Sequence, residues 1–168
     1  MAGDRFAPSA QQALEALVRR VQGSGKTGSG TNGVRALFLG PSGAEKHRAA
    51  AWVAQRLGVK LQRVDLARLT SKYVGETEKN LQRLFDAAHA SGALLYFDES
   101  DALFGKRPEA RETEDAYAGF DVNFLLPRIE AYQGVLVFAA YRREDIDAAL
   151  VRRLSAVVDF GESAEEEA

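Results

Sequence analysis

The 168-residue sequence contains no cysteine, which excludes disulfide-linked scaffolds, zinc fingers and thiol enzymes. It also lacks an excess of basic charge, because 22 Lys and Arg side chains stand against 24 Asp and Glu side chains. A formal net charge of −2 gives no basic surface for nucleic acid, so we expect no nucleic-acid partner. No apolar run reaches the roughly 18 residues of a membrane span, and no signal peptide is visible at the N-terminus. We therefore expect a cytoplasmic protein with no membrane partner.

The chain divides into four segments by composition. Residues 1–22 form an N-terminal helical segment, and residues 23–33 are a flexible linker rich in glycine and serine. Residues 34–160 are the folded core, and residues 161–168 are an acidic, disordered tail. The linker contains the string GSGKT, but we reject it as a phosphate loop. It follows a helix rather than a strand, and Arg20 stands where the motif requires glycine.

Within the core, short apolar runs alternate with longer amphipathic ones. The expected strands are residues 34–39, 59–64, 93–97, 135–140 and 155–160. The expected helices are residues 45–57, 76–90, 120–132 and 144–153. This alternation predicts an α/β fold, with a parallel sheet covered by helices on both faces.

The loop after the first expected strand has the context of a phosphate-binding loop. Its residues are Gly40, Pro41, Ser42, Gly43, Ala44, Glu45, Lys46 and His47. A strand, a glycine-containing loop, a lysine and a helix N-terminus together provide donors for an anion. Two positions depart from this pattern: Glu45 replaces the second glycine, and His47 replaces the Ser or Thr hydroxyl that binds magnesium.

These departures leave two interpretations open, a phosphate site or an ordinary strand-to-helix turn. A carboxylate about 4 Å from a phosphate charge costs on the order of 4 kcal/mol at an effective dielectric of 20. That cost applies unless Glu45 turns outward to solvent, where an acid in the first helical turn is favourable. His47 offers a nitrogen to a metal that prefers oxygen, so we expect no direct magnesium bond from it.

Two acids, Asp98 and Glu99, follow the expected strand 93–97. At the carboxyl end of a buried strand, one carboxylate can reach a magnesium shell and the next an attacking water. Buried strands also often end in acids without any such role, so this pair alone is only moderately specific. Its position after a loop that carries Lys46 strengthens the functional interpretation.

Over roughly residues 34–160 the sequence resembles the AAA family of ring-forming ATPases. The resemblance rests on GPSGAEKH, SKYVGETEKNLQRLFDAA, LLYFDESDALFGKR, GVLVFAAYRRED and DAALVRRLSAVVDF. It implies a P-loop NTPase fold, a three-layer sandwich whose five-stranded parallel sheet has the strand order 5-1-4-3-2. It also implies ATP and Mg²⁺ as cofactors, hydrolysis coupled to protein remodelling, a homo- or hetero-oligomeric ring, and a polypeptide substrate.

By the same resemblance, Lys46 would contact the β and γ phosphates and Asp98 would hold magnesium through water. Glu99 would polarise the hydrolytic water. The pore loop that grips substrate would be Lys72, Tyr73 and Val74, and the arginine fingers would be Arg152 and Arg153. Each role has a simpler alternative: Tyr73 as an ordinary loop aromatic, and the two arginines as charges that favour a helix C-terminus.

Further departures from the family bear on hydrolysis. Tyr141 stands where the family usually has a polar sensor residue, often Asn, and Pro127 falls inside an expected helix that it should kink or shorten. After Phe160 the sequence enters the acidic tail, which is too short and polar to form the family's helical lid.

Three interpretations follow from these residues. The chain is a working ATPase, a pseudo-ATPase that acts as a regulatory or binding subunit of an AAA ring, or an inactive α/β core. Because Glu45 and His47 affect the same few atoms, we expect weak or no ATP binding by the chain alone, and an impaired site.

Overall fold

Five parallel strands form a single sheet in the order β2-β3-β4-β1-β5. The computed structural model describes residues 6–27, 33–64, 75–98 and 122–161. The strands are β1 (Val34–Leu39), β2 (Leu61–Val64), β3 (Leu94–Phe97), β4 (Val135–Ala140) and β5 (Ala156–Asp159). This order, read from the opposite edge, is the predicted 5-1-4-3-2, so the expected fold class is confirmed.

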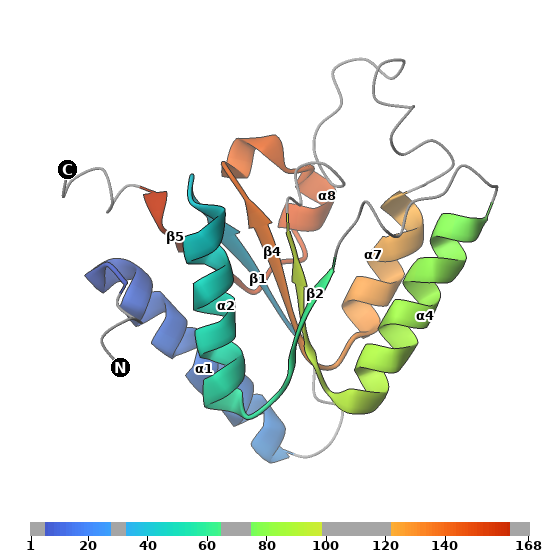
Figure 1. Ribbon diagram of the computed structural model, residues 1–168, viewed down its shortest axis with the longest axis horizontal. Coiled ribbons are helices and arrows are strands. Elements are labelled where there is room, and N and C mark those ends of the chain that lie inside the picture. Colours follow the sequence, from blue (N-terminus) through green and yellow to red (C-terminus); the bar gives the residue numbers. More distant parts are fainter. Residues whose placement is uncertain (1–5, 28–32, 65–74, 99–121, 162–168) are drawn as a thin grey trace.

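Helices cover both faces of the sheet. They are α1 (Pro8–Thr27), α2 (Gly43–Leu57), α4 (Glu76–Ser91), α7 (Val122–Ala131), the 3₁₀ helix η1 (Arg143–Asp145) and α8 (Ala148–Val151). Figure 1 shows α1 and α2 on one side of the sheet and α4 and α7 on the other. The result is a three-layer α/β sandwich.

Each face of the sheet has its own apolar core. Between the sheet and helices α1 and α2, the largest buried side chains include Leu14, Trp52 and Tyr96. Between the sheet and helices α4, α7 and α8, they include Phe85 and Leu150. Strands β3 and β4 are buried along their whole length, and this double burial explains why they read as continuous apolar runs.

Two helical segments differ from the expectation. Helix α1 continues to Thr27, through the GSGKT string and into the segment expected to be a linker. Once a helix has formed, each added residue makes one more hydrogen bond, and this outweighs the poor propensity of glycine here. The GSGKT string therefore lies on a helix and not after a strand.

The expected helix 144–153 is instead a short 3₁₀ helix, η1, followed by a separate short helix, α8. The break occurs at Asp147, whose carboxylate accepts a hydrogen bond of 2.8 Å from the Ala149 amide and so begins a new helix.

Pro127 does lie inside α7, as expected, and its ring is exposed. Among the described helices, none is both long and apolar enough to cross a bilayer.

Candidate functional site

The loop between β1 and α2 leads directly into a helix N-terminus. Gly40 has a φ of 147°, and a Cβ there would lie 3.2 Å from the Cβ of Phe160, so a larger residue would be strained. Ser42 caps the helix, because its hydroxyl accepts a hydrogen bond of 3.0 Å from the Glu45 amide. The 15-residue helix α2 therefore presents its positive dipole end where β1 finishes.

A cavity of about 560 Å³ lies outside the carboxyl ends of the strands, and we call it the loop cavity. In open parallel sheets, ligands bind at the carboxyl ends of the strands. The binding crevice forms where the connections that leave two adjacent strands run to opposite faces of the sheet. The cavity is lined by Gly40, Pro41, Gly43, Ala44, Lys46, His47, Arg63, Asp98, Ala139, Ala140 and Tyr141. The structure thus brings together, around one cavity, the loop, the first of the two acids and Tyr141.

Lys46 lies at the base of the loop cavity and is only 6% exposed. Its ammonium donates hydrogen bonds to the carbonyl oxygens of Gly40, at 2.5 Å, and Ala140, at 2.9 Å. These bonds join the loop to the end of β4 and compensate a buried charge that would otherwise be costly. The lysine of the motif is therefore positioned by backbone carbonyls at the place where phosphate oxygens would approach.

Glu45 is half-buried and is not among the described residues that line the loop cavity. Its backbone amide forms the helix cap with Ser42, and its carboxylate lies in the first turn of α2. This is the favourable position for an acid near a helix dipole. The structure therefore places Glu45 in the first turn of α2 and outside the lining of the loop cavity.

His47 does line the loop cavity. Its imidazole packs edge-on against the ring of Tyr96, with ring centroids 5.3 Å apart. The position that would carry a magnesium-binding hydroxyl therefore holds an aromatic ring supported by a second ring. Of the two residues that depart from the metal-binding pattern, His47 is the one that lines the cavity.

Asp98 follows β3 directly, and its carboxylate accepts a hydrogen bond from the guanidinium of Arg63. The side chains of Asp98 and Arg63 are 22% and 60% exposed respectively. Sequence reasoning missed Arg63. The available signal was a basic residue near the carboxyl end of β2, a strand that the predicted order places beside β3.

Tyr96, two residues before Asp98, is buried on the face of β3 that packs against α1 and α2. Burial raises the pKa of the Tyr96 hydroxyl, and the nearby Asp98 carboxylate raises it further, while Arg63 lowers it. Within the described part of the chain this hydroxyl has no hydrogen-bond partner. Tyr96 therefore stays neutral and acts as a packing surface for His47.

Tyr141 follows β4 and is 54% exposed. It lines the loop cavity and also a second cavity of about 600 Å³, and the two cavities share Gly40 and Pro41 in their linings. The guanidinium of Arg142 lies 5.7 Å from the centre of its ring. Tyr141 is thus an exposed part of the cavity lining, and its role as a sensor stays a prediction.

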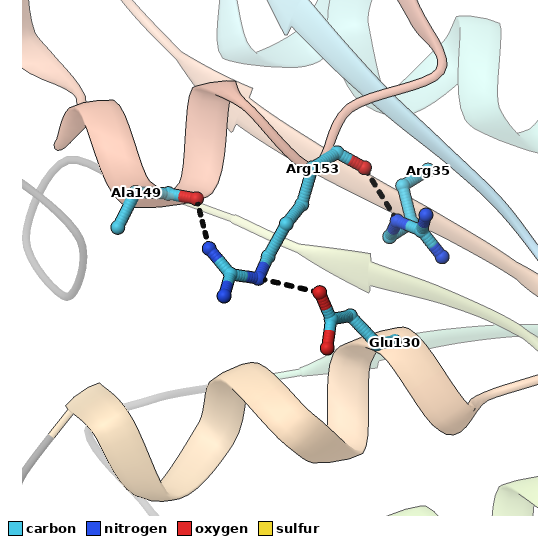
Figure 2. A network of polar contacts seen from close by, with 4 residues as sticks. All are labelled: Arg35, Glu130, Ala149 and Arg153. Carbon is cyan, nitrogen blue, oxygen red and sulfur yellow. Dashed lines mark hydrogen bonds and ion pairs between the residues drawn. The ribbon is translucent and has the colours of Figure 1, made fainter.

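The two predicted finger residues differ in their surroundings, and neither is among the residues that line the loop cavity. Arg153 donates hydrogen bonds to Glu130, at 2.8 Å, and to the carbonyl oxygen of Ala149, at 2.7 Å, and its own carbonyl accepts one from Arg35 (Figure 2). Arg152, at the end of α8, is exposed. Arg153 is held within the subunit, whereas Arg152 faces solvent.

Four predicted site residues lie outside the described residues. They are the pore-loop positions Lys72, Tyr73 and Val74 and the second acid, Glu99. Their roles remain predictions.

The described donors do not fit a magnesium ion. Of the groups lining the loop cavity, Asp98 supplies a carboxylate that is already paired with Arg63, and His47 supplies a nitrogen. Magnesium prefers several oxygen ligands in octahedral geometry. Across the described ranges, no group of three or more His, Cys, Asp or Glu side chains is placed to hold a metal.

Comparisons with known proteins agree with the fold and the loop. The model of the family described as "ATPase family associated with various cellular activities (AAA)" matches residues 36–162. The chain is 39% identical over 126 residues to "Uncharacterized AAA family ATPase y4kL" of Sinorhizobium fredii, covering 74% of this chain and 38% of that protein. It is 38% identical to "ATPase family gene 2 protein" of Schizosaccharomyces pombe, covering 69% of this chain and 14% of that protein.

A further relative is "26S proteasome regulatory subunit 7 homolog B" of Arabidopsis thaliana, 34% identical, covering 74% of this chain and 28% of that protein. The chain thus spans well under half the length of these relatives. The family match covers most of the sequence and includes every strand of the sheet except the first two residues of β1. The chain belongs to the AAA family of ATPases.

Proposed function

We propose that the chain is the nucleotide-binding α/β core of an AAA ring subunit, and that its own site is impaired in ATP hydrolysis. The observation that carries this proposal is His47, which lines the loop cavity at the position of the family's magnesium-binding hydroxyl. The pairing of Asp98 with Arg63 supports it, because it occupies the carboxylate that would hold the metal's water shell.

Negative charge on the phosphoryl oxygens must be stabilised in the transition state of ATP hydrolysis. Phosphoryl transfer depends on cations that neutralise charge on the phosphoryl oxygens, and magnesium is the main one in this class of enzyme. Removing one preorganised electrostatic group costs on the order of 10²–10³ in rate in well-studied enzymes. In this site Asp98 is paired with Arg63 and His47 replaces a hydroxyl, so the rate of hydrolysis should fall by at least this factor.

Other features support nucleotide binding by the same core. Lys46, the N-terminus of α2 and the loop cavity together form a site for a phosphate chain. By resemblance to the family we further propose that subunits assemble in a homo- or hetero-oligomeric ring, with Lys72, Tyr73 and Val74 contacting a polypeptide substrate. Glu99 is proposed as the residue that would polarise water in whatever hydrolysis remains.

The test is phosphate release by the purified chain with ATP and magnesium, compared between the parent, His47→Thr and Glu45→Ala. We expect release near background from the parent and an increase only in His47→Thr. Glu45→Ala is the matched control, because it changes a neighbouring residue of the same loop that does not face the cavity. Turnover by the parent of about 1 s⁻¹ or faster, an ordinary enzymatic rate, would contradict the proposal.

A second candidate function is that of a regulatory subunit, and the exposure of Arg152 favours it. An exposed arginine away from the chain's own loop cavity is available to a neighbouring subunit, whereas Arg153 is held by Glu130. If the chain completes a partner's nucleotide site, it should stimulate the ATPase of a more complete AAA protein from the same cell. Stimulation that is lost in Arg152→Ala supports this role, and stimulation that survives the substitution counts against the finger mechanism.

A further inference from the structure

We propose that the guanidinium of Arg63 takes the place of magnesium in the loop cavity, so that the site binds nucleotide polyphosphate without a divalent cation. This inference rests on the proposed nucleotide site and extends it to the identity of the cation. The described side chains of the cavity do not suit a magnesium ion. The carboxylate of Asp98 is paired with Arg63, and the imidazole of His47 stands where the family has a hydroxyl.

Arg63 is placed to act on an anion in the cavity. It comes from the penultimate position of β2, an edge strand, and reaches across the end of β3 to Asp98. Its side chain lines the loop cavity and is 60% exposed, so the guanidinium can also be approached from the cavity. A guanidinium carries five donors and binds carboxylate and phosphate oxygens with the same geometry.

The charges in the cavity also favour a metal-free anion. Its described ionisable lining consists of the cations Lys46 and Arg63, the carboxylate Asp98, the imidazole of His47 and the phenol of Tyr141. Arg63 pairs with Asp98, so this carboxylate does not oppose an anion that approaches the positive end of α2. A magnesium ion entering this site would lie against the Arg63 charge and would have to displace it from Asp98.

The pair with Asp98 positions Arg63 rather than stabilising the fold. A half-exposed ion pair contributes little to stability. Its effect here is to hold a flexible side chain at the edge of the cavity. Replacing Arg63 should therefore leave the fold intact and change only the binding of anions.

The experiment is an amide chemical-shift titration of the ¹⁵N-labelled chain with ATP, once in excess EDTA and once in excess magnesium. This measurement detects weak dissociation constants and reports the shifted amides at the N-terminus of α2. We expect shifts in EDTA, with dissociation constants in the two conditions that agree within about threefold. Phosphate release is not measured, so a failure of this inference is distinguishable from a failure of the proposed impairment of hydrolysis.

Two substitutions at the pair sharpen the test. Arg63→Ala should weaken binding in EDTA about tenfold, the loss of one charge-assisted contact, and Arg83→Ala should not weaken it. Arg83 is the matched control, because it is an exposed arginine on α4 bonded to Asn80 and is not among the residues lining the cavity. Asp98→Asn should tighten binding, because it removes a negative charge from the cavity while its amide oxygen can still accept a hydrogen bond from Arg63; a metal-dependent site would lose affinity.

The inference is overturned if magnesium tightens binding tenfold or more, if the amides of α2 do not shift in EDTA, or if Arg63→Ala and Arg83→Ala behave alike. It is also overturned if Asp98→Asn weakens binding. The ¹⁵N spectrum of each variant shows in the same sample that the chain remains folded.

Discussion

Arg153 and Glu130 form an ion pair, with 2.8 Å between Arg153 Nε and Glu130 Oε2, that joins the end of α8 to α7 (Figure 2). The same guanidinium donates to the carbonyl oxygen of Ala149, one of the last carbonyls of α8. The neighbouring Arg152 is exposed. The two adjacent arginines share one family assignment, but Arg153 is bonded within its own subunit and Arg152 is exposed to solvent.

This difference predicts unequal effects on the free energy of unfolding. Arg153→Ala should lower the free energy of unfolding by about 1–2 kcal/mol, because it removes a partly exposed ion pair and a hydrogen bond to a helix carbonyl. Arg152→Ala should change it by less than about 0.5 kcal/mol, as is usual for exposed positions. Urea denaturation of the two variants measures both values. Equal losses for Arg152 and Arg153 would show that the ion pair does not hold α8.

The two buried tyrosines Tyr132 and Tyr96 predict changes of opposite sign in the free energy of unfolding. The Tyr132 hydroxyl donates a hydrogen bond to the carbonyl oxygen of Ala93, whereas the Tyr96 hydroxyl has no partner in the described structure. Tyr132→Phe should destabilise the chain by about 1–2 kcal/mol, since a buried acceptor loses its donor. Tyr96→Phe should stabilise it by about 1 kcal/mol, since an unpaired hydroxyl is removed from the core. Thermal or urea unfolding distinguishes the two signs, and a loss of stability in Tyr96→Phe would indicate a partner for that hydroxyl.

The same hydroxyls predict a loss of stability at alkaline pH. Burial raises the pKa of Tyr132 from 10.0 to about 12 and that of Tyr96 as well. In the unfolded chain both groups lose their protons near pH 10, while the folded chain retains them, so the unfolded state gains stability as the pH rises. The contribution of Tyr132 is fully present below pH 10 and is lost between pH 10 and about 12. The free energy of unfolding measured from pH 8 to 12 should fall in this window, and less steeply in Tyr132→Phe; equal slopes would exclude Tyr132 as a cause.

The sequence allowed the sheet to be anticipated more fully than the site. The strands β3 and β4 are predictable because both faces are buried and their residues are apolar without interruption. The break before α8 also had a local signal, since Asp147 followed by small apolar residues is a helix start. The resemblance to the AAA family supplied the strand order, which periodicity alone does not determine.

The site depends on contacts between strands that are distant in the sequence. Arg63 and Asp98 are 35 residues apart and meet because β2 pairs with β3. The position of Glu45 also depends on Ser42, because the Ser42 hydroxyl accepts a hydrogen bond from the Glu45 amide and so fixes the first turn of α2. The sequence marks both Glu45 and His47 as departures from the loop pattern, whereas of these two residues only His47 lines the cavity.

The unequal placement of these two residues predicts unequal effects on nucleotide affinity. In the presence of magnesium, His47→Thr should tighten the binding of ATP by about tenfold, because it restores an oxygen ligand for the metal. Glu45→Ala should change the affinity by less than about twofold, because its charge is outside the cavity. A titration with a fluorescent ATP analogue compares the two single variants. A larger gain from Glu45→Ala would mean that its carboxylate faces the phosphates after all.

We propose that the loop of this AAA core limits its own nucleotide chemistry. The most direct test is the affinity of the parent chain for a fluorescent ATP analogue with magnesium, beside the double variant Glu45→Gly with His47→Thr. We expect a dissociation constant well above about 1 µM for the parent and clearly tighter binding for the variant. Micromolar or tighter binding by the parent, or a variant that binds no better than the parent, would contradict it.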